Sequence, residues 1–366
     1  MSLSVGIVGL PNVGKSTLFT ALTKNEVLIA NYPFATIDPT VGVVGVPDNR
    51  LNTLSALSGS KETIPAVIEF VDIAGLVKGA SAGEGLGNKF LANIRETNMI
   101  AEVVRIFEDS DVHHVSGTID PMGDIETINL ELIMADAETV SKRNSGLERD
   151  VKRGDKDALA EKDLLTRLLP HLEAGHLANT LEMTDDEKVL IKGLHLLTMK
   201  PFLYICNRKQ DAYNLDEQND ERWVELLEFF EKSNSQYVVV DAGMEHELRE
   251  LGDDEKTEFR REYGAQDSGV EELIRACYTR LGLMSYFTTG EMETRAWTVP
   301  IGSSGPEAGA AIHTDFKDKY IRAQVVTFDD LVETGSKATA RDQGKLRTEG
   351  KEYIVQDGDV IEFMHS

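Results

Sequence analysis

Short runs of apolar, often β-branched residues recur along the first 240 positions and alternate with stretches of helical periodicity. Such runs are typical of strands buried on both faces of a parallel sheet. They occupy residues 4–8, 66–71, 100–107, 201–206 and 236–240. Because they alternate with helical segments, they predict an α/β fold with a doubly wound, mainly parallel sheet.

One stretch, residues 124–197, lacks strand-like runs and is rich in Leu, Ala, Glu and Lys. Amphipathic spacing in its first half predicts a helix with a buried stripe made of Leu130, Ile133, Met134 and Ala137. The second half predicts a returning helix that carries Leu159, Leu164, Leu165, Leu168 and Leu169. We therefore expect an α-helical hairpin, with its turn near 144–156, inserted between strands of the sheet domain.

From residue 283 onward, the pattern changes to short strand-like runs separated by Gly-rich or charged turns. These runs lie at 294–300, 320–327 and 353–363 and predict a separate, mostly β module. The expected organisation is a sheet domain in two parts, 1–123 and 198–282, with an insertion at 124–197 and a C-terminal domain at 283–366.

Composition narrows the class of protein. With 366 residues, 41% hydrophobic and 28% charged, the chain suits two or three globular domains and does not fit collagen-like, disordered or disulfide-scaffold proteins. Its two cysteines, Cys206 and Cys277, favour a reducing compartment. The N-terminus lacks the pattern of a signal peptide, and no apolar run approaches the roughly 18 residues of a spanning helix. We expect a cytoplasmic protein without a membrane partner.

The formal net charge of −25 repels nucleic-acid phosphates at long range, so free DNA is not an expected partner. Any nucleic-acid partner must meet a local basic face. The predicted hairpin turn offers one, because residues 142–167 contain eight Lys and Arg against six Asp and Glu. Solvated helix surface is the alternative explanation of this charge run.

The strongest chemical motif is GLPNVGKS at residues 9–16, which fits the phosphate-loop pattern G-x-x-x-x-G-K-[ST]. Its glycines allow backbone N–H groups to surround phosphate oxygens, and Lys15 reaches the β- and γ-phosphates. The hydroxyl of Ser16 is offered to Mg²⁺, and the helix that begins here adds the positive end of its dipole. Since the motif lies between a predicted buried strand and a helix, it predicts a nucleoside triphosphate site.

A second motif, DIAG at residues 72–75, follows the apolar run at 66–71. The carboxylate of Asp72, at a strand end, can hold magnesium through water, and the N–H of Gly75 can contact the γ-phosphate. The second protein ligand of Mg²⁺ is expected from the intervening loop. Thr36 and Thr40 both qualify there, and spacing does not choose between them.

The base-recognition segment is expected at residues 207–211, directly after the run at 201–206. GTPases carry N-K-x-D at this point because guanine presents two adjacent N–H donors to a carboxylate. If Asn207 heads the motif, Gln210 takes the position of the acid. A register shifted by one residue uses Asp211 but puts Arg208 in place of asparagine. The first register needs no strand bulge, so it favours adenine over guanine.

Catalysis lacks one familiar group. Many GTPases orient the attacking water with a glutamine directly after D-x-x-G, but this chain has Leu76 there. The water must be positioned by another group, by a partner or by a bound monovalent cation, for which K⁺ is the candidate and Asn12 a candidate ligand. His114, in a predicted loop, is a candidate catalytic group, although a loop histidine is usually just solvated.

Five segments together resemble one known family. They are GLPNVGKST at 9–17, NYPFAT at 31–36, DIAGLVKGA at 72–80, GEGLGN at 83–88 and HVSG at 114–117. Over nearly its whole length the chain resembles the YchF, or Obg-like ATPase, family. The resemblance implies a P-loop domain of the translation-factor GTPase class, interrupted by the hairpin and followed by a TGS domain, a ubiquitin-like β-grasp module.

The resemblance also implies hydrolysis of ATP in preference to GTP, and binding to the ribosome, which we expect at its large subunit, in a translation-associated or stress-response role. It implies that Ser16 and Thr36 hold Mg²⁺ and that His114 takes part in catalysis. The expected site therefore consists of Lys15 and His114 for catalysis, Asn12, Val13, Gly14, Lys15, Ser16, Thr17, Gly75, Asn207 and Arg208 for the nucleotide, and Ser16, Thr36 and Asp72 for the metal.

The chain departs from the family pattern at the base site. The usual N-x-x-E motif has Gln210 in place of its acid, and Asp241-Ala242-Gly243 replaces the usual S-A of the second base-contacting loop. Two other functions therefore stay open beside ATP hydrolysis. One is a GTP-dependent switch that uses Asp211, and the other is an adaptor for which the nucleotide is only a conformational ligand.

Overall fold

The computed structural model describes residues 3–23, 40–73, 86–109, 119–248, 251–252, 255–256, 258–259 and 268–365. The chain forms two compact units. The first is built mainly from Phe70–Val270 with the N-terminal strand and helix, and the second joins Val43–Glu69 to Glu271–Ser366. Within the described ranges, no helix combines the length and the apolar character needed to cross a membrane.

A six-stranded sheet with the order β2-β4-β1-β5-β7-β9 carries the N-terminal motifs. Its strands are β1 (Ser4–Gly9), β2 (Val41–Gly45), β4 (Val67–Asp72), β5 (Met99–Arg105), β7 (Phe202–Arg208) and β9 (Gln236–Asp241). Parallel pairing joins β1 to β5, β5 to β7 and β7 to β9. All five predicted apolar runs form strands of this sheet, and β2 is a strand that was not expected.

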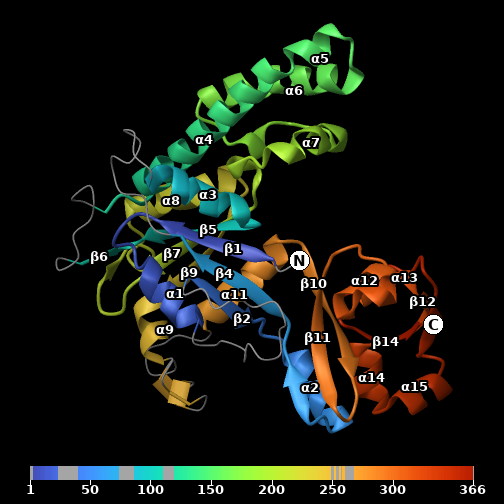
Figure 1. Ribbon diagram of the computed structural model, residues 1–366. Coiled ribbons are helices and arrows are strands. Elements are labelled where there is room, and N and C mark those ends of the chain that lie inside the picture. Colours follow the sequence, from blue (N-terminus) through green and yellow to red (C-terminus); the bar gives the residue numbers. More distant parts are fainter. Residues whose placement is uncertain are drawn as a thin grey trace. The chain divides into compact units, whose positions relative to one another are not determined.

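Helices cover both faces of the sheet, which makes it doubly wound (Figure 1). α1 (Lys15–Thr23) and α9 (Ala242–Leu248) lie on one face, and α3 (Leu86–Glu96) and α8 (Glu221–Lys232) lie on the other. Between the sheet and the second pair is a core that includes Val8, Ile94, Ile100, Ile125 and Leu226. Burying each such side chain contributes about 1.5–3 kcal/mol. A short ribbon of β6 (Phe107–Glu108) and β8 (Tyr213–Asn214) extends beyond the sheet.

The insertion between β5 and β7 is helical, as predicted, and its helices extend away from the sheet in green (Figure 1). Its elements are α4 (Pro121–Gly146), α5 (Glu148–Lys152), α6 (Lys156–Glu173) and α7 (Asp185–Ile191), with 3-10 turns η3 (Ala178–Thr180), η4 (Lys192–Leu194) and η5 (Leu197–Met199). Asp120 caps α4 by accepting a hydrogen bond from the backbone N–H of Gly123, and Pro121 occupies the first turn.

The buried stripe of α4 differs from the prediction. Leu130 and Met134 are 54% and 57% exposed, whereas Leu132 is fully buried. The reason is a polar residue on the buried face, because the carboxylate of Asp136 accepts a hydrogen bond of 2.8 Å from the backbone N–H of Thr198. Ile133 is buried as predicted, and Ala137 packs against the same core. The buried face therefore overlaps the predicted stripe but extends to Leu132 and Asp136, and apolar periodicity does not include a buried aspartate.

The returning helix α6 agrees better with its prediction. Leu164, Leu165 and Leu168 are fully buried, although Leu159 is 47% exposed. A salt bridge of 2.6 Å between Arg143 and the largely buried Glu161 joins α4 to α6. The hairpin therefore has its own packed core and a salt bridge that joins α4 to α6.

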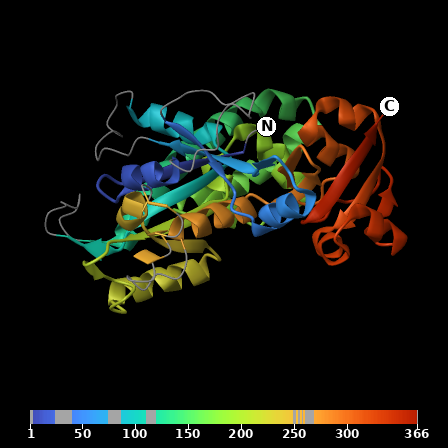
Figure 2. The same ribbon diagram turned by 90° about the horizontal axis from the view of Figure 1, so that it is seen from below.

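The second unit is built on a mixed sheet with the order β13-β12-β14-β10-β11-β3. The strands are β3 (Glu62–Ile64), β10 (Leu283–Thr289), β11 (Glu293–Pro300), β12 (Tyr320–Thr327), β13 (Arg347–Glu349) and β14 (Asp359–His365). Its C-terminal helices are α12 (Gly305–Ile312), α13 (Thr314–Asp318), α14 (Phe328–Thr334) and α15 (Lys337–Asp342), coloured orange to red with their strands (Figure 2). α11 (Gly269–Arg280) precedes β10. β14 is shorter than the predicted run at 353–363, because residues 356–358 form a turn before it.

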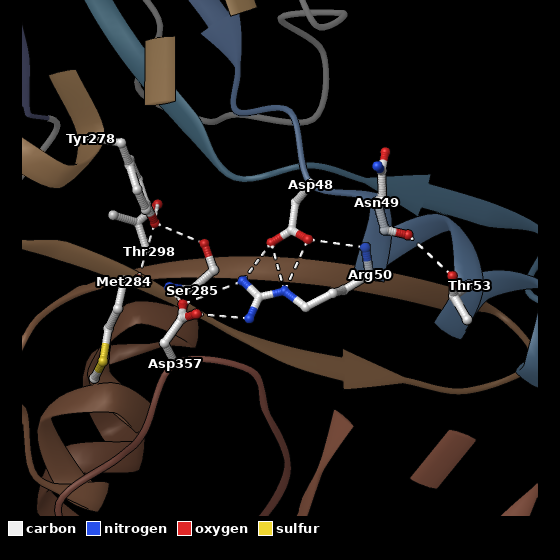
Figure 3. Close-up of polar contacts among 9 residues, drawn as sticks. All are labelled: Asp48, Asn49, Arg50, Thr53, Tyr278, Met284, Ser285, Thr298 and Asp357. Atoms are coloured by element: carbon white, nitrogen blue, oxygen red, sulfur yellow. Dashed lines mark hydrogen bonds and ion pairs between the residues drawn. The ribbon is translucent and has the colours of Figure 1, made fainter. Parts of the chain in front are cut away.

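The second unit also takes in a segment from the N-terminal half. α2 (Asn49–Ser58) packs on β10 and β11, and β3 pairs in parallel with β11. The guanidinium of Arg50 pairs with Asp48 and Asp357, both at 2.7 Å, and Asp357 accepts a hydrogen bond from the backbone N–H of Ser285 (Figure 3). This pattern of long-range contacts is not visible in the sequence. The division into segments at 123, 197 and 282 stays a prediction.

A carboxyl group lies in the core of the first unit without a hydrogen-bonding partner. Glu102 on β5 is 0% exposed, and neither of its side-chain oxygens has a hydrogen bond within the described structure. Burial, together with the nearby charge of Asp124, raises its pKa well above the ordinary value. Burial therefore favours the neutral form of Glu102 over the charged form.

We expect Glu102→Gln to reduce the dependence of stability on pH. A raised folded-state pKa contributes stability that is complete below the ordinary pKa of 4.5 and is lost as the pH rises through the raised value. Urea unfolding should show the free energy of unfolding falling less between about pH 5 and about pH 8 in the variant than in the wild type. Exposed Glu126 on α4 supplies the matched control, Glu126→Gln. Equal slopes for Glu102→Gln and the wild type would contradict the prediction.

Candidate functional site

The phosphate-loop motif forms the connection between β1 and α1. β1 ends at Gly9 and α1 begins at Lys15, as the strand and helix patterns predict. Asn12 and Gly14 have φ angles of 66° and 94°, in the left-handed region. Asparagine and glycine tolerate this region best, so these two residue types fit the turn that the loop makes.

Close packing explains two of the motif's glycines. A Cβ at Gly9 would lie 2.9 Å from the carbonyl oxygen of Val103 on the neighbouring strand. A Cβ at Gly14 would lie 2.2 Å from the side-chain nitrogen of Asn207. Both distances are far below an ordinary van der Waals contact, so neither position admits a larger residue without rearrangement of the loop.

Asn207 holds the phosphate loop from the end of β7. Its side-chain nitrogen donates a hydrogen bond of 2.8 Å to the carbonyl oxygen of Val13, and its side-chain oxygen accepts one of 3.1 Å from the backbone N–H of Ala242. The side chain is 3% exposed. The carboxamide of Asn207 thus connects the loop, β7 and α9. The predicted role of Asn207 in nucleotide binding stays a prediction.

Two further residues support this arrangement: Asp241, which the sequence places in the second base-contacting loop without indicating its contact with α9, and Asn214, which the sequence does not single out. Asp241 accepts a hydrogen bond of 2.9 Å from the backbone N–H of Met244 at the start of α9, and burial raises the pKa of its carboxyl. Asn214 exchanges two hydrogen bonds, of 3.0 and 2.9 Å, with the backbone of Lys209. Aspartate just before a helical run is a capping signal that could have revealed Asp241, whereas nothing local marks Asn214.

The strand register bears on the base-recognition segment. The pairing of β7 with β9 runs without interruption from Leu203 to Arg208, as the register headed by Asn207 requires. Gln210 then holds the position of the acid. The guanidinium of Arg208 lies 3.4 Å from a carboxylate oxygen of Glu217, and this ion pair directs the Arg208 side chain toward the segment after β8.

Lys15 and Asp72 lie together at the carboxyl end of the sheet. The ammonium of Lys15 forms an ion pair with the carboxylate of Asp72, and both side chains are largely buried, at 11% and 24% exposed. The backbone N–H of Asp72 donates a hydrogen bond of 2.8 Å to the carbonyl oxygen of Thr40. The structure thus brings together two predicted site residues that are 57 positions apart in the sequence.

The same corner fits a magnesium ion. Ser16, exposed in the first turn of α1, offers a hydroxyl oxygen, and Asp72 offers a carboxylate, and Mg²⁺ prefers such oxygen ligands. Across the described ranges, no group of three or more His, Cys, Asp and Glu side chains could hold a metal. A magnesium ion that is completed by phosphate oxygens and water does not need such a group.

The remaining predicted site residues differ in their burial, and some of them lie outside the described residues. Val13 is 1% exposed and contributes its carbonyl to the contact with Asn207, while Asn12 is exposed and Thr17 half-buried. Thr36, Gly75, Leu76 and His114 lie outside the described residues. Their roles stay predictions.

Comparison with known proteins gives the family. A family model described as a 50S ribosome-binding GTPase matches residues 4–140, and the model YchF-GTPase_C, described as a protein of unknown function, matches residues 283–366. The chain is 51% identical over 363 residues to the ribosome-binding ATPase YchF of Bacillus subtilis strain 168, and the match covers 99% of each chain. This chain belongs to the YchF family.

Other YchF proteins match it over the same extent. The ribosome-binding ATPase YchF of Escherichia coli O157:H7 is 47% identical over 364 residues, with coverage of 100% of this chain and 99% of the relative. The solved structure of the Schizosaccharomyces pombe YchF GTPase has a TM-score of 0.88 at 35% identity and covers 99% of this chain and 98% of its own. The predicted fold class, a P-loop α/β domain with a helical insertion and a C-terminal domain, is confirmed.

Gly14→Ala should weaken nucleotide binding while Gly154→Ala does not. Both glycines have positive φ, of 94° and 79°, but nothing lies within 4 Å of a Cβ at Gly154. The control thus carries the backbone strain of about 1–2 kcal/mol without the clash. Titration with a fluorescent ATP analogue should show at least about a tenfold loss of affinity for Gly14→Ala alone. Equal affinities of the two variants would mean that contact with Asn207 does not shape the loop.

Proposed function

We propose that this YchF protein is a Mg²⁺-dependent P-loop ATPase that acts in association with the ribosome, in the cytoplasm. The observation that carries the proposal is the phosphate loop between β1 and α1, held in shape by Gly9, Gly14 and the carboxamide of Asn207. Family membership supports the same activity, since the relatives from B. subtilis and E. coli are named ribosome-binding ATPases.

The chain's own groups account for binding of the triphosphate. Backbone N–H groups of residues 12–17 surround the phosphates, and the N-terminus of α1 adds positive potential. Lys15 exchanges the carboxylate of Asp72 for β- and γ-phosphate oxygens, which frees Asp72 to hold Mg²⁺ through water. Ser16 and Thr36 are the proposed direct ligands, and Gly75 donates its N–H to the γ-phosphate. A Mg²⁺ ion held by these residues would neutralise charge that develops on the phosphates.

Adenine is the proposed base. The neutral amide of Gln210 cannot replace the carboxylate that accepts both adjacent N–H donors of guanine. Guanine therefore lacks the paired hydrogen bonds by which GTPases select it over adenine. The uninterrupted pairing of β7 supports the register that puts Gln210 rather than Asp211 at this point. Arg208, at the end of the same strand, borders the proposed base site.

The attacking water needs a group other than Leu76. We assign this role to His114, whose imidazole can accept a hydrogen bond from water when neutral. A K⁺ ion near Asn12 is a second source of stabilisation for the phosphate charge. Both assignments rest on the sequence and on the family pattern.

The hairpin turn is the proposed ribosome contact. In this region Lys142 and Arg153 expose 74% and 78% of their side chains. Basic groups at one end of an acidic chain favour contact with ribosomal RNA while the rest of the surface is repelled. The C-terminal domain is a second proposed contact, and the large subunit the proposed partner. ATP turnover would then regulate translation or a stress response by changing how the protein binds.

The nucleotide proposal is tested by phosphate release with ATP and with GTP, in K⁺ and in Na⁺. We expect faster turnover of ATP, and a loss of at least about 100-fold in Lys15→Ala because a phosphate-stabilising charge is removed. Exposed Lys188 supplies the control, Lys188→Ala, which should keep wild-type turnover. A clear preference for GTP would overturn the assignment of adenine, and unchanged turnover in Lys15→Ala would overturn the assignment of the loop.

The ribosome proposal is tested by co-sedimentation of the chain with purified ribosomes. Reversing two charges at the hairpin turn, Lys152→Glu with Arg153→Glu, should weaken co-sedimentation and reduce its sensitivity to salt. The matched control is Lys188→Glu with Lys192→Glu, which makes the same change of charge on α7 and η4. Equal loss in both double variants would point to net charge rather than to the hairpin turn.

A further inference from the structure

A continuous set of contacts runs from the Asp72 strand end to the base of the helical insertion. The first contact is Ile73, which follows Asp72 directly and is fully buried. A Cβ at Gly6 on β1 would lie 2.7 Å from Cδ1 of Ile73 and 3.0 Å from the hydroxyl oxygen of Thr97. The absence of a side chain at Gly6 therefore lets Ile73 and Thr97 approach the same point of β1.

Thr97 directly follows α3, the helix that runs from Leu86 to Glu96, and this end of the helix is held by a half-buried lysine. The hydroxyl of Thr97 donates a hydrogen bond of 2.9 Å to the carbonyl oxygen of Ile94. The ammonium of Lys200 donates to the carbonyl oxygens of Arg95, at 3.1 Å, and of Thr97. Burial lowers the pKa of Lys200. A cation at a helix C-terminus is favourable, and here it also ties α3 to the segment that leads into β7.

The same segment is joined to α4. The hydroxyl of Thr198, two residues before Lys200, donates a hydrogen bond of 2.6 Å to the carboxylate of Asp136. The backbone N–H groups of Leu197 and Thr198 donate two more, of 2.8 Å each, so the fully buried carboxylate accepts three hydrogen bonds. This attachment is costly to break, because a buried carboxylate that loses its donors keeps its desolvation penalty without compensation.

A second, direct connection lies beside the first. The guanidinium of Arg95, near the end of α3, donates a hydrogen bond of 3.4 Å to the hydroxyl of Thr139 on α4. α3 is thus attached to the insertion through Lys200 and η5 and through its own side chain. A displacement of α3 would act on α4 at Asp136 and Thr139, in the second half of that helix.

We propose that this α3–η5–α4 connection, formed by Arg95, Thr97, Asp136, Thr198 and Lys200, couples the nucleotide site to the orientation of the helical insertion. The proposal rests on the proposed function, since it describes how binding at the phosphate loop reaches the hairpin turn. Coupling between two sites is reciprocal, so a partner held at the hairpin changes nucleotide affinity by the same factor as nucleotide changes the partner's affinity.

Amide hydrogen exchange of the full chain, with and without Mg²⁺ and a non-hydrolysable ATP analogue, tests the coupling. The wild type should show a nucleotide-dependent change of exchange in peptides from α4 and η5. Lys200→Met keeps the length of the side chain but removes its donors, so this change should be lost while affinity for a fluorescent ATP analogue stays as in the wild type. Lys188→Met, on the exposed face of α7, is the control that should keep the change.

Each other outcome has a defined meaning. An unchanged response of α4 in Lys200→Met, or a wild type that binds the analogue without any change in α4, overturns the coupling. Loss of analogue binding by the wild type overturns the proposed function instead. Should Lys200→Met fail to fold, Arg95→Ala removes the direct connection at a half-exposed site and should reduce the same response, and an undiminished response there also overturns the coupling.

Discussion

The carboxamide of Asn207 is the contact on which the nucleotide site depends. Its nitrogen donates to the carbonyl of Val13 and its oxygen accepts from the backbone of Ala242, so one side chain fixes the phosphate loop, the end of β7 and the start of α9. Gly14 is the counterpart of this contact, because a Cβ there would lie 2.2 Å from the same nitrogen. The glycine is therefore required by its neighbour as well as by its φ angle.

Electrostatics place a second constraint on the site. A chain with a net charge of −25 can bind a polyanion only where positive groups are concentrated. The phosphate loop supplies Lys15 and the N-terminus of α1, and Asp72 lies close enough to pair with Lys15. This proximity places the lysine proposed for the phosphates and the carboxylate proposed for the metal at one corner of the sheet, where a magnesium-bound triphosphate would satisfy both.

The sequence was informative where local chemistry dictates structure. The apolar runs predicted five strands of the main sheet, and the phosphate-loop motif predicted the turn between β1 and α1. Long-range polar contacts were not predictable, because neither member of a pair carries a local signal. Asp136 lies on the buried face of α4, where a pattern of apolar residues does not place an aspartate. The ion pair between Arg50 and Asp357 spans 307 positions and joins α2 to the C-terminal strands. Asn207 was expected beside the nucleotide, but its two hydrogen bonds to backbone are visible only in three dimensions.

A crystal structure of the chain with Mg²⁺ and a non-hydrolysable ATP analogue tests the central claim most directly. The account predicts a triphosphate wrapped by residues 12–17, with the ammonium of Lys15 on the phosphates and the carboxamide of Asn207 still bonded to Val13 and Ala242. A nucleotide bound elsewhere, or an Asn207 side chain turned away from the loop to contact the base, would contradict it.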